Sequence, residues 1–335
     1  EAEADLREAI ALVQNDLALP GSRWQYGRAS HNLGVVLLRP GPSLDDKLAQ
    51  PARAAEGLEL LRKSKEILQN LTEEFPAIPQ YQKELAAICL NLGRIENRQP
   101  STQAQGAADL KRSLELDHAL SEHYPEIPDY RLEHARTALE LADRPTDAGE
   151  ALALDAIAEL ETLAGTYGTV PDYRNDLGRG YFALAKNLLR AEKLAQARRA
   201  VDEAIRCQAE ALKMAPGNRD YLAALRDDQF VASIVLRKQG ELADAATAAE
   251  EIVRLVPDDL LSYYRAASLL TECAGAAQGD AREDYSRRAV QALQKGAQRR
   301  LIREPKQLDS KDFRDLNDRE DFRRLKDSLG SPKAA

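Results

Sequence analysis

The chain has 335 residues, of which 44% are hydrophobic and 30% are charged, and its formal net charge is −8. A chain of this length and composition can bury a sizeable core in water, and it is too charged for a protein that lies within lipid. The negative charge disfavours long-range attraction to nucleic acid or to an anionic membrane surface. We therefore expect neither a nucleic-acid partner nor direct membrane contact.

The amino-acid usage favours helices over sheets. The chain contains only 5 Phe, 1 Trp and 1 Met, whereas alanine and leucine recur throughout. Such usage suits closely packed helices, because strands favour aromatic and β-branched residues. Cys89, Cys207 and Cys273 are far apart and form no C-x-x-C motif, so we interpret them as buried apolar residues. The expected fold class is all-α.

Residues 1–20 have the pattern of one amphipathic helix with no helix before it, in the sequence EAEADLREAIALVQNDLAL. We interpret this segment as the orphan second helix of a truncated unit. The chain is then expected to be a fragment of a longer protein.

A short motif recurs through residues 21–300. It reads FPAIPQY in its first copy and YPEIPDY in its second, and the later copies are looser. The copies occupy residues 75–81, 124–130, 167–173, 215–221 and 256–264. Each copy precedes a helical pattern, so the motif is expected to be the joint at which one helix ends and the next begins.

The two prolines of the motif act differently. The first biases its predecessor away from helical angles, so a helix must end at Phe75 or Tyr124. The second suits the first turn of a new helix, where no amide donor is needed. We expect the branched residue between them to form a hydrophobic staple. The staple residues are Ile78, Ile127 and Val170, and the tyrosines in equivalent places are Tyr81, Tyr130, Tyr173 and Tyr221.

The spacing before each joint supports stacked helix pairs. The counts start from the second residue of each joint. The residue twelve positions earlier is always small, as a helix crossing requires, and the residue five positions earlier is always apolar, as a face stacked on the next unit requires. The small residues are Ser64, Ser113, Ala156, Ala204 and Ala245. The apolar residues are Leu71, Leu120, Leu163, Ala211 and Ile252. Between joints lie turn sequences, so each unit reads as helix, turn, helix, joint.

Residues 230–259 resemble the tetratricopeptide repeat. Gly240 at the turn, Ala245, Ala249 and Pro257 fall at the spacing of that family, and HNLG at 31–34 is similar to the leucine and glycine pair of its first helix. The resemblance implies an α-α superhelix, a tetratricopeptide-like solenoid of about six helix pairs over residues 21–300. It further implies that the first helices line a concave face that binds peptides or proteins.

The joints together with the ending LDSKDFRDLNDREDFRRL, residues 308–325, resemble the helical tails of large bacterial serine/threonine protein kinases. This resemblance implies a kinase domain before the chain, with a membrane span between the two in many such kinases. The chain itself has no glycine-rich phosphate loop, V-A-I-K lysine or H-R-D loop, so it is not expected to phosphorylate anything.

Residues 301–335 are expected to be a C-terminal capping segment. Phe313, Leu316, Phe322 and Leu325 form two i, i+3 pairs in an otherwise charged stretch, as short helices over the end of a solenoid would. Between Arg282 and Lys326 the chain holds 14 Lys and Arg against 9 Asp and Glu, a balance of +5. We interpret this basic stretch as a solvated face.

Motifs of catalysis or of metal and cofactor binding are not found. His118 and His123 are five residues apart, which does not align two ligands on a helix face, and the sequence has no H-E-x-x-H, G-x-S-x-G or P-loop motif. We therefore expect no enzymatic activity, no metal and no cofactor in this chain.

Polar residues on the first helices are the candidates for partner binding on the concave face. They are Arg28, Asn32, Lys83, Asn91, Arg131, Arg174, Asn175, Arg179 and Arg226. Asn32 and Asn91 match one asparagine of the carboxylate clamp of some tetratricopeptide domains, but the Lys-x-x-x-Asn of the first clamp helix is missing. The alternative for an asparagine before Leu-Gly is a hydrogen bond between adjacent helices.

The leading hypothesis is a non-catalytic protein-interaction scaffold, the repeat tail of a serine/threonine kinase, that binds a peptide or protein partner as a monomer. One alternative is a structural or self-associating spacer. Another is an independent all-α enzyme, which would need a deep pocket with converging titratable side chains.

Overall fold

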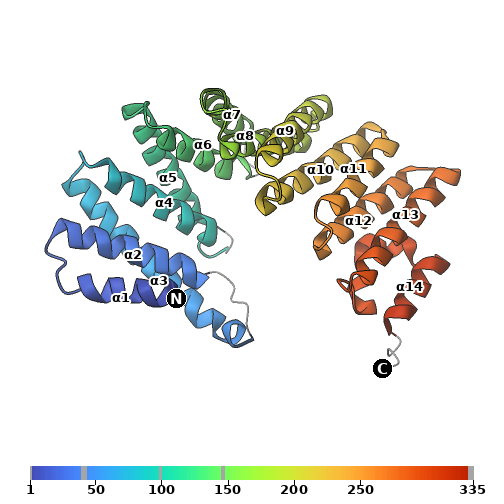
Figure 1. The fold of residues 1–335 in the computed structure, drawn as a ribbon, viewed down its shortest axis with the longest axis horizontal. Coiled ribbons are helices and arrows are strands. Elements are labelled where there is room, and N and C mark those ends of the chain that lie inside the picture. The colour runs from blue at the N-terminus through green and yellow to red at the C-terminus, as the bar shows by residue number, and fades with distance from the viewer. Residues whose placement is uncertain (1, 39–43, 98–99, 145–147, 331–335) are drawn as a thin grey trace. The chain divides into compact units, whose positions relative to one another are not determined.

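The computed structural model describes residues 2–38, 44–97, 100–144 and 148–330. Every regular element in these ranges is a helix, which confirms the all-α prediction. The chain divides into two compact units, Glu1–Leu141 and Ala142–Ala335, called unit 1 and unit 2 below. In both, helices that follow one another in the chain pack against one another, as in a tetratricopeptide-like solenoid (Figure 1).

Unit 1 is built from two helix pairs with further helices at its two ends. Its helices are α1 (Ala2–Val13), α2 (Pro20–Leu38), α3 (Leu44–Glu74), α4 (Pro79–Glu96), α5 (Gln103–His123) and α6 (Pro128–Ala142). The pairs are α2 with α3 and α4 with α5, and the first helices α2 and α4 also contact each other. The core of this unit gathers Leu61 and Leu68 of α3 with Leu85 and Ile88 of α4.

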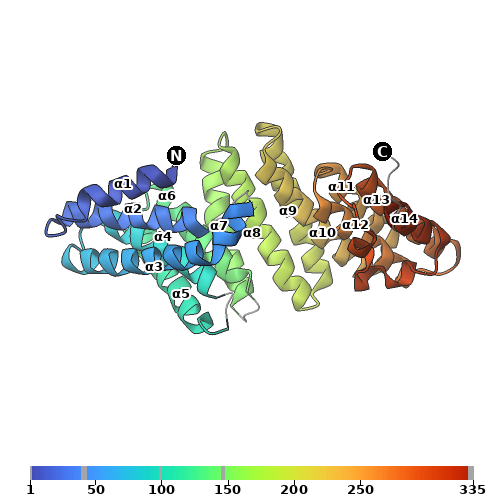
Figure 2. The same ribbon diagram turned by 90° about the horizontal axis from the view of Figure 1, so that it is seen from below.

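Unit 2 continues the same order of helices. Its helices are α7 (Gly149–Thr166), α8 (Pro171–Arg190), α9 (Leu194–Met214), α10 (Arg219–Gln239), α11 (Leu242–Leu255), α12 (Leu260–Ala276), α13 (Gly279–Gln298), η1 (Pro305–Leu308), η2 (Lys311–Leu316) and α14 (Glu320–Gly330). The first helix α8 contacts α10, and α10 contacts α12. Neighbouring helices run side by side both in Figure 1 and in Figure 2.

The joints have the predicted stop and start. Pro79, Pro128 and Pro171 each begin a helix, and Tyr81, Tyr130, Tyr173 and Tyr221 are all buried at equivalent places in successive first helices. This arrangement follows from the prolines, because a helix start needs no amide hydrogen from its first residue.

The residues predicted to form the hydrophobic staple are only partly covered, and Ile127 is half-buried. Ile78 and Val170 take the extended backbone of a helix N-cap, and they remain 38% and 36% exposed. A packing contact across the joint is made by its two aromatic residues. Phe75 and Tyr81 meet edge to face with ring centroids 6.3 Å apart, and Tyr124 and Tyr130 do so at 5.8 Å. Aromatic pairs prefer this edge-to-face geometry.

The small residues lie at helix crossings, as their spacing predicts. Ser64 of α3 is fully buried and its hydroxyl donates a 2.6 Å hydrogen bond to the backbone oxygen of Gly27 in α2. Ser113 of α5 donates in the same way to Ala86 of α4, at 2.9 Å. The hydroxyls are therefore satisfied by the backbone of the partner helix, which keeps the two helices close without a buried unpaired donor.

The end of unit 2 is covered by η1, η2 and α14. Phe313 and Phe322 are buried, and Phe313 also lies against Tyr264 of α12 with ring centroids 6.0 Å apart. The first of the two predicted helices, at Phe313 and Leu316, is 3₁₀ rather than α-helical.

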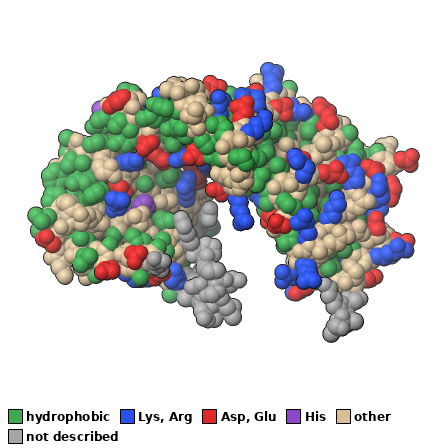
Figure 3. Space-filling model, in the orientation of Figure 1, with side chains coloured by type: hydrophobic (Ala, Val, Ile, Leu, Met, Phe, Trp, Pro, Cys, Tyr) green, Lys and Arg blue, Asp and Glu red, His purple; other side chains and the backbone are tan. Residues whose placement is uncertain are grey.

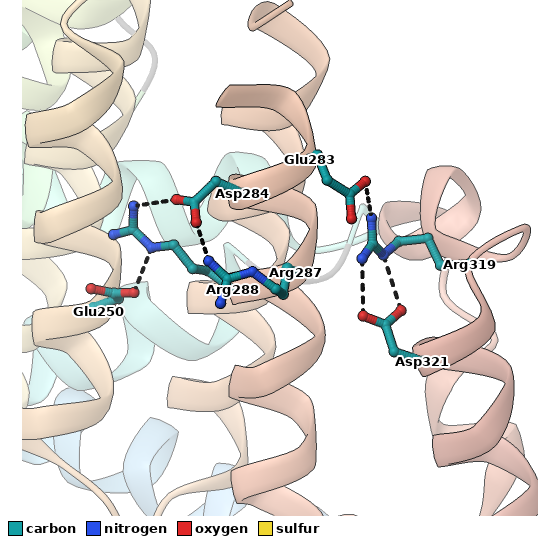
Figure 4. A network of polar contacts seen from close by, with 7 residues as sticks. All are labelled: Glu250, Glu283, Asp284, Arg287, Arg288, Arg319 and Asp321. Carbon is teal, nitrogen blue, oxygen red and sulfur yellow. Dashed lines mark hydrogen bonds and ion pairs between the residues drawn. The ribbon is translucent and has the colours of Figure 1, made fainter. Parts of the chain in front are cut away.

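One ion pair joins this closing segment to α13. Arg319 bonds both Glu283 of α13, at 2.7 Å, and Asp321, at 2.9 Å. On the other side of α13, Arg288 pairs with Glu250 of α11 at 2.8 Å (Figure 4). The Arg319 guanidinium lowers the pKa of the Glu283 carboxyl.

Candidate interaction surface on the first helices

The first-helix surface is defined here as the outward side of α2, α4 and α6 in unit 1 and of α8, α10 and α12 in unit 2. The predicted partner-binding residues all lie on these helices. Their environments differ, because some are exposed and others already hold neighbouring helices together.

Arg28 and Asn32 of α2 are both exposed and lie one helical turn apart. The Arg28 guanidinium carbon lies 5.6 Å from the centroid of the Trp24 ring, within cation–π range. Trp24 itself packs against the core of unit 1, but its indole nitrogen is buried without a hydrogen-bond partner. Trp24, Arg28 and Asn32 therefore form one strip along α2, with an apolar ring at one end and open polar groups at the other.

Asn91 of α4 is used within the fold. Its side-chain amide nitrogen lies 2.8 Å from Nε2 of His31 in α2, and because an amide nitrogen only donates, Nε2 must accept. His31 is buried, and burial lowers its pKa to about 4. The interhelical hydrogen bond that the sequence left open as an alternative is thus present at Asn91, whereas Asn32 stays exposed.

The other two candidate cations of unit 1 lie on α4 and α6. The Lys83 ammonium is 5.7 Å from the centroid of the Tyr130 ring, and Arg131 is partly exposed. Arg94, which the sequence reasoning missed, joins α4 to α6 through a 2.9 Å bond to Glu140. A signal for it exists in the sequence, since Arg94 directly follows the LNLG motif at 90–93.

In unit 2, the three candidates on α8 differ in partners and exposure. Arg174 pairs with Glu210 of α9, the second helix of its own pair, at 3.4 Å. Asn175 has a buried side-chain oxygen with no hydrogen-bond partner among the described residues. Arg179 is exposed and bonds the buried carboxylate of Asp176 at 3.1 Å. Of these three, Arg179 presents the most open side chain.

Arg226 of α10 belongs to an ion-pair network between first helices. It bonds Asp259, at the start of α12, at 2.9 Å, and its side chain is only 14% exposed. Arg265 of α12 returns to Asp227 of α10, and Arg237 of α10 bonds Glu272 of α12 at 2.8 Å. The sequence alone does not predict the ion pairs of Arg265 with Asp227 and of Arg237 with Glu272, because the partners are 38 and 35 residues apart.

Grooves also open between successive second helices. One of about 360 Å³ lies between α7 and α9 and is lined by Leu154, Tyr181 and Leu188. Another of about 310 Å³ lies between α3 and α5, where Arg62 and Lys65 face the buried carboxylates of Glu96 and Asp109. These grooves were missed, because the sequence reasoning looked for partners on the first helices alone.

The three cysteine thiols lie in the core of the fold. Cys89, Cys207 and Cys273 are buried, which confirms that prediction, and burial raises their pKa values to about 12, 11 and 11. A neutral buried thiol is a poor nucleophile. Within residues 2–38, 44–97, 100–144 and 148–330, no cluster of three or more His, Cys, Asp or Glu could hold a metal ion.

None of the helices in the described part of the chain is both long and apolar enough to cross a membrane.

Comparisons with known proteins gave matches among solved structures. No family model matches the chain, and no curated protein matches it. A thermophilic TPR protein of Thermus thermophilus aligns with 73% of this chain and 98% of its own, at 15% identity and a TM-score of 0.39. A nuclear import adaptor of S. pombe covers 85% and 96%, at 11% identity and 0.44. Yeast Tom70 covers 92% and 63%, at 14% identity and 0.36.

Proposed function

We propose that this chain is a non-catalytic scaffold that binds a peptide or protein partner on its first-helix surface. The observation that carries the proposal is the strip of Trp24, Arg28 and Asn32 on α2. Both polar side chains are exposed and Arg28 lies over the Trp24 ring, while nearby Asn91 is already bonded to His31. Aromatic and arginine side chains are enriched among residues that dominate binding energy.

The chemistry of the strip defines the partner it suits. Arg28 offers guanidinium donors, and Asn32 one turn away offers both a donor and an acceptor. An extended peptide backbone presents alternating donors and acceptors that an amide side chain can bond, and a carboxylate or backbone oxygen of the partner can accept from Arg28. In unit 2, exposed Arg179 supplies a cation on α8, and its guanidinium also bonds the buried carboxylate of Asp176 at 3.1 Å.

A peptide selection with matched variants tests the proposal. A phage-displayed peptide library is panned on the chain, and the selected peptides are measured by fluorescence anisotropy. Replacement of both Arg28→Ala and Asn32→Ala should weaken binding by about tenfold or more, which corresponds to ~1.4 kcal/mol. Arg112→Ala is the matched control, because Arg112 is also exposed in unit 1 but lies on the second helix α5. Equal loss in both variants, or no binder at all, would contradict the proposal.

We also propose that the chain is the repeat tail of a larger bacterial serine/threonine protein kinase. The support is the resemblance of the joints and of residues 308–325 to such tails. The reading frame upstream of Glu1 tests this: a kinase domain there supports it, and a coding region without one argues against it.

A second candidate function, a self-associating spacer, is favoured by the exposure of α1. No residue of α1 is buried, and Leu12 is 76% exposed. Exposed leucines on a helix can mediate association between copies. Light scattering at increasing protein concentration distinguishes the two, because a chain that stays monomeric is no self-associating spacer.

A further inference from the structure

A cleft of about 920 Å³ lies in unit 2 between the end of α13 and α14. Its apolar lining includes Ile302, Leu325 and Leu329, and its charged lining consists of Arg300, Arg303 and Arg324. None of the described lining residues is acidic. The cleft therefore combines an apolar floor with a positively charged rim.

The positive charge of the rim is largely uncompensated. Among the described residues, Arg300 and Arg303 have no carboxylate partner, and the Arg303 Nε instead donates to the backbone oxygen of Arg300 at 2.7 Å. Within the part of the chain that the structure describes, Arg324 pairs only with Glu320, one turn earlier on its own helix. In the groove between α3 and α5, by contrast, Glu96 and Asp109 pair with the neighbouring cations.

Arg300 occupies a backbone position that favours glycine. Its φ is 61°, in the left-handed region, where the side chain of a non-glycine residue is strained. The amide of Arg300 bonds the oxygen of Ala297 and the amide of Leu301 bonds that of Gly296, at 2.9 and 3.0 Å. This pattern is the Schellman motif that ends many helices, and glycine is its preferred left-handed residue.

Two other helix ends of unit 2 show what this position normally needs. Gly240 occupies it after α10, with φ 86°. Glu192 occupies it after α8, with φ 56°, and its carboxylate bonds Lys238 of α10 at 2.8 Å. Glu192 thus has a partner within the fold, whereas Arg300 has the strain without a carboxylate partner among the described residues. Strained residues with no structural partner are candidates for function.

The cleft shares one lining residue with a second groove, whose charged lining is mainly basic but includes Glu250. Gln298 lines both, and the neighbouring groove of about 630 Å³ between α11 and α13 adds Lys295 and Arg299. On the face drawn in Figure 3, Lys and Arg side chains lie over this end of unit 2 with carboxylates among them. The basic stretch that the sequence analysis interpreted as an ordinary solvated face therefore includes a hollow with net positive lining.

We propose that the cleft between α13 and α14 binds a short acidic segment of a partner protein. Carboxylates of the segment would accept from Arg300 and Arg303, since guanidinium groups bond carboxylates in a forked geometry. An apolar side chain between those carboxylates would pack on Leu329, which is partly exposed at the cleft, above the buried Ile302 and Leu325. The apolar floor favours a peptide over a nucleic acid. Phosphates of a nucleic acid would pair with the arginines, but they would not pack on the apolar residues of the cleft. This site is separate from the first-helix surface and does not depend on it.

The proposal is tested with a defined probe and the full chain. The probe is a fluorescein-labelled peptide with blocked ends, in which one leucine is flanked on each side by two glutamates. Its binding is measured by fluorescence anisotropy, with the glutamine version of the peptide, a DNA duplex and inorganic phosphate as competitors. Saturable binding is expected to be displaced by unlabelled acidic peptide and to weaken as salt rises, because the contacts are partly exposed ion pairs.

Arg300→Gly separates binding from folding. Glycine suits the left-handed position, so this variant should keep or raise the melting temperature. Its affinity for the acidic peptide should fall about tenfold, because the Arg300 guanidinium is lost. Glu192→Gly is the matched control: it makes the same backbone change at the end of α8 and should leave peptide affinity unchanged. Arg303→Gln should lower the affinity for the acidic peptide without changing the left-handed backbone at Arg300.

Four results would overturn the proposal. They are the absence of saturable binding, full affinity in Arg300→Gly, equal loss in Glu192→Gly, and stronger competition by DNA or phosphate than by the acidic peptide. The binding of library peptides at Arg28 and Asn32 is measured independently, so failure at one site leaves the result at the other intact.

Discussion

Asn91 of α4 donates a hydrogen bond of 2.8 Å to Nε2 of His31 in α2, and so joins the first helices of two successive pairs. Because Nε2 accepts, the buried imidazole is neutral and carries its proton on Nδ1. The contact gives a structural role to a residue whose sequence position also suggested partner binding.

Replacement of Asn91 by alanine is therefore expected to destabilise unit 1. It leaves His31 Nε2 buried without its donor, which costs about 1–3 kcal/mol. Urea unfolding followed by the fluorescence of Trp24 measures the loss, because Trp24 is the single tryptophan and packs against the core of unit 1. Asn32→Ala is the matched control on α2, and it should change the unfolding free energy little because Asn32 is exposed. Equal effects of the two changes would argue against the structural role of Asn91.

Asp117 of α5 gives unit 1 a pH dependence of the opposite sign to that of His31. Burial raises its pKa to about 6, while Thr137 donates to it and Glu133 and His134 lie near. A carboxyl with a raised pKa stabilises the fold below its unfolded pKa, and this contribution is lost as pH rises to about 6. Asp117→Asn should therefore gain stability relative to the native chain between pH ~4 and ~6, by roughly 3 kcal/mol at the upper end.

In the Asp117→Asn variant, the pH dependence of stability that comes from His31 can be measured without the opposing contribution of Asp117. Its pKa is about 4 in the fold, against an ordinary value of 6.5, so protonation of the unfolded chain destabilises unit 1 as pH falls through that window. With Asp117 neutralised, the Trp24-monitored unfolding free energy should drop by roughly 3 kcal/mol between pH ~6.5 and ~4. In the native chain the two titrations partly offset each other. A variant whose stability stays flat in that window would show that His31 is not buried as described.

Asp259 both begins α12 and holds Arg226. Its carboxylate accepts from the backbone amides of Leu261 and Ser262, and it bonds Arg226 at 2.9 Å. Asp259→Ala removes the cap and the ion pair, so a loss of ~1–2 kcal/mol is expected for unit 2. Asp259→Asn keeps an N-cap oxygen and should cost less than ~1 kcal/mol. Hydrogen exchange of the α12 amides measures both, and equal losses would show that the cap contributes nothing.

The crossing of α2 and α3 depends on two facing glycines. A Cβ on Gly34 would lie 2.8 Å from the backbone oxygen of Gly57, and one on Gly57 would lie 2.9 Å from that of Gly34. Gly34→Ala should destabilise unit 1 by ~1–3 kcal/mol or more, because the helices must move apart. Gly21→Ala is the control on the same helix, where no atom lies within 4 Å of the added Cβ. It should be neutral or stabilising by up to ~1 kcal/mol.

The repeat joints and the core could be predicted from the sequence because their causes are local. Proline restricts the backbone of itself and its predecessor, so the helix starts at Pro79, Pro128 and Pro171 follow from the motif. Small residues at a constant distance from the joint indicate helix crossings, and Ser64 and Ser113 lie there. The edge-to-face contacts of the aromatic residues were not predicted, because they depend on how the chain turns between the two helices.

The availability of the candidate site residues could not be predicted, because it depends on distant partners. Asn91 meets a histidine 60 residues away, and Arg226 meets an aspartate 33 residues away. Nothing in the local sequence distinguishes these two from Asn32 and Arg179, which stay exposed. The left-handed backbone conformation of Arg300 could not be predicted from the sequence either, because arginine rarely adopts a positive φ.

Hydrogen exchange of the chain with and without a peptide selected from the library tests the central claim most directly. If the chain is a scaffold that binds through its first helices, the peptide should slow exchange in α2 and α4 and leave α3 and α5 unchanged. The protection of α2 should be lost in the variant with Arg28→Ala and Asn32→Ala. Protection confined to α3 and α5, or unchanged by that variant, would contradict the account.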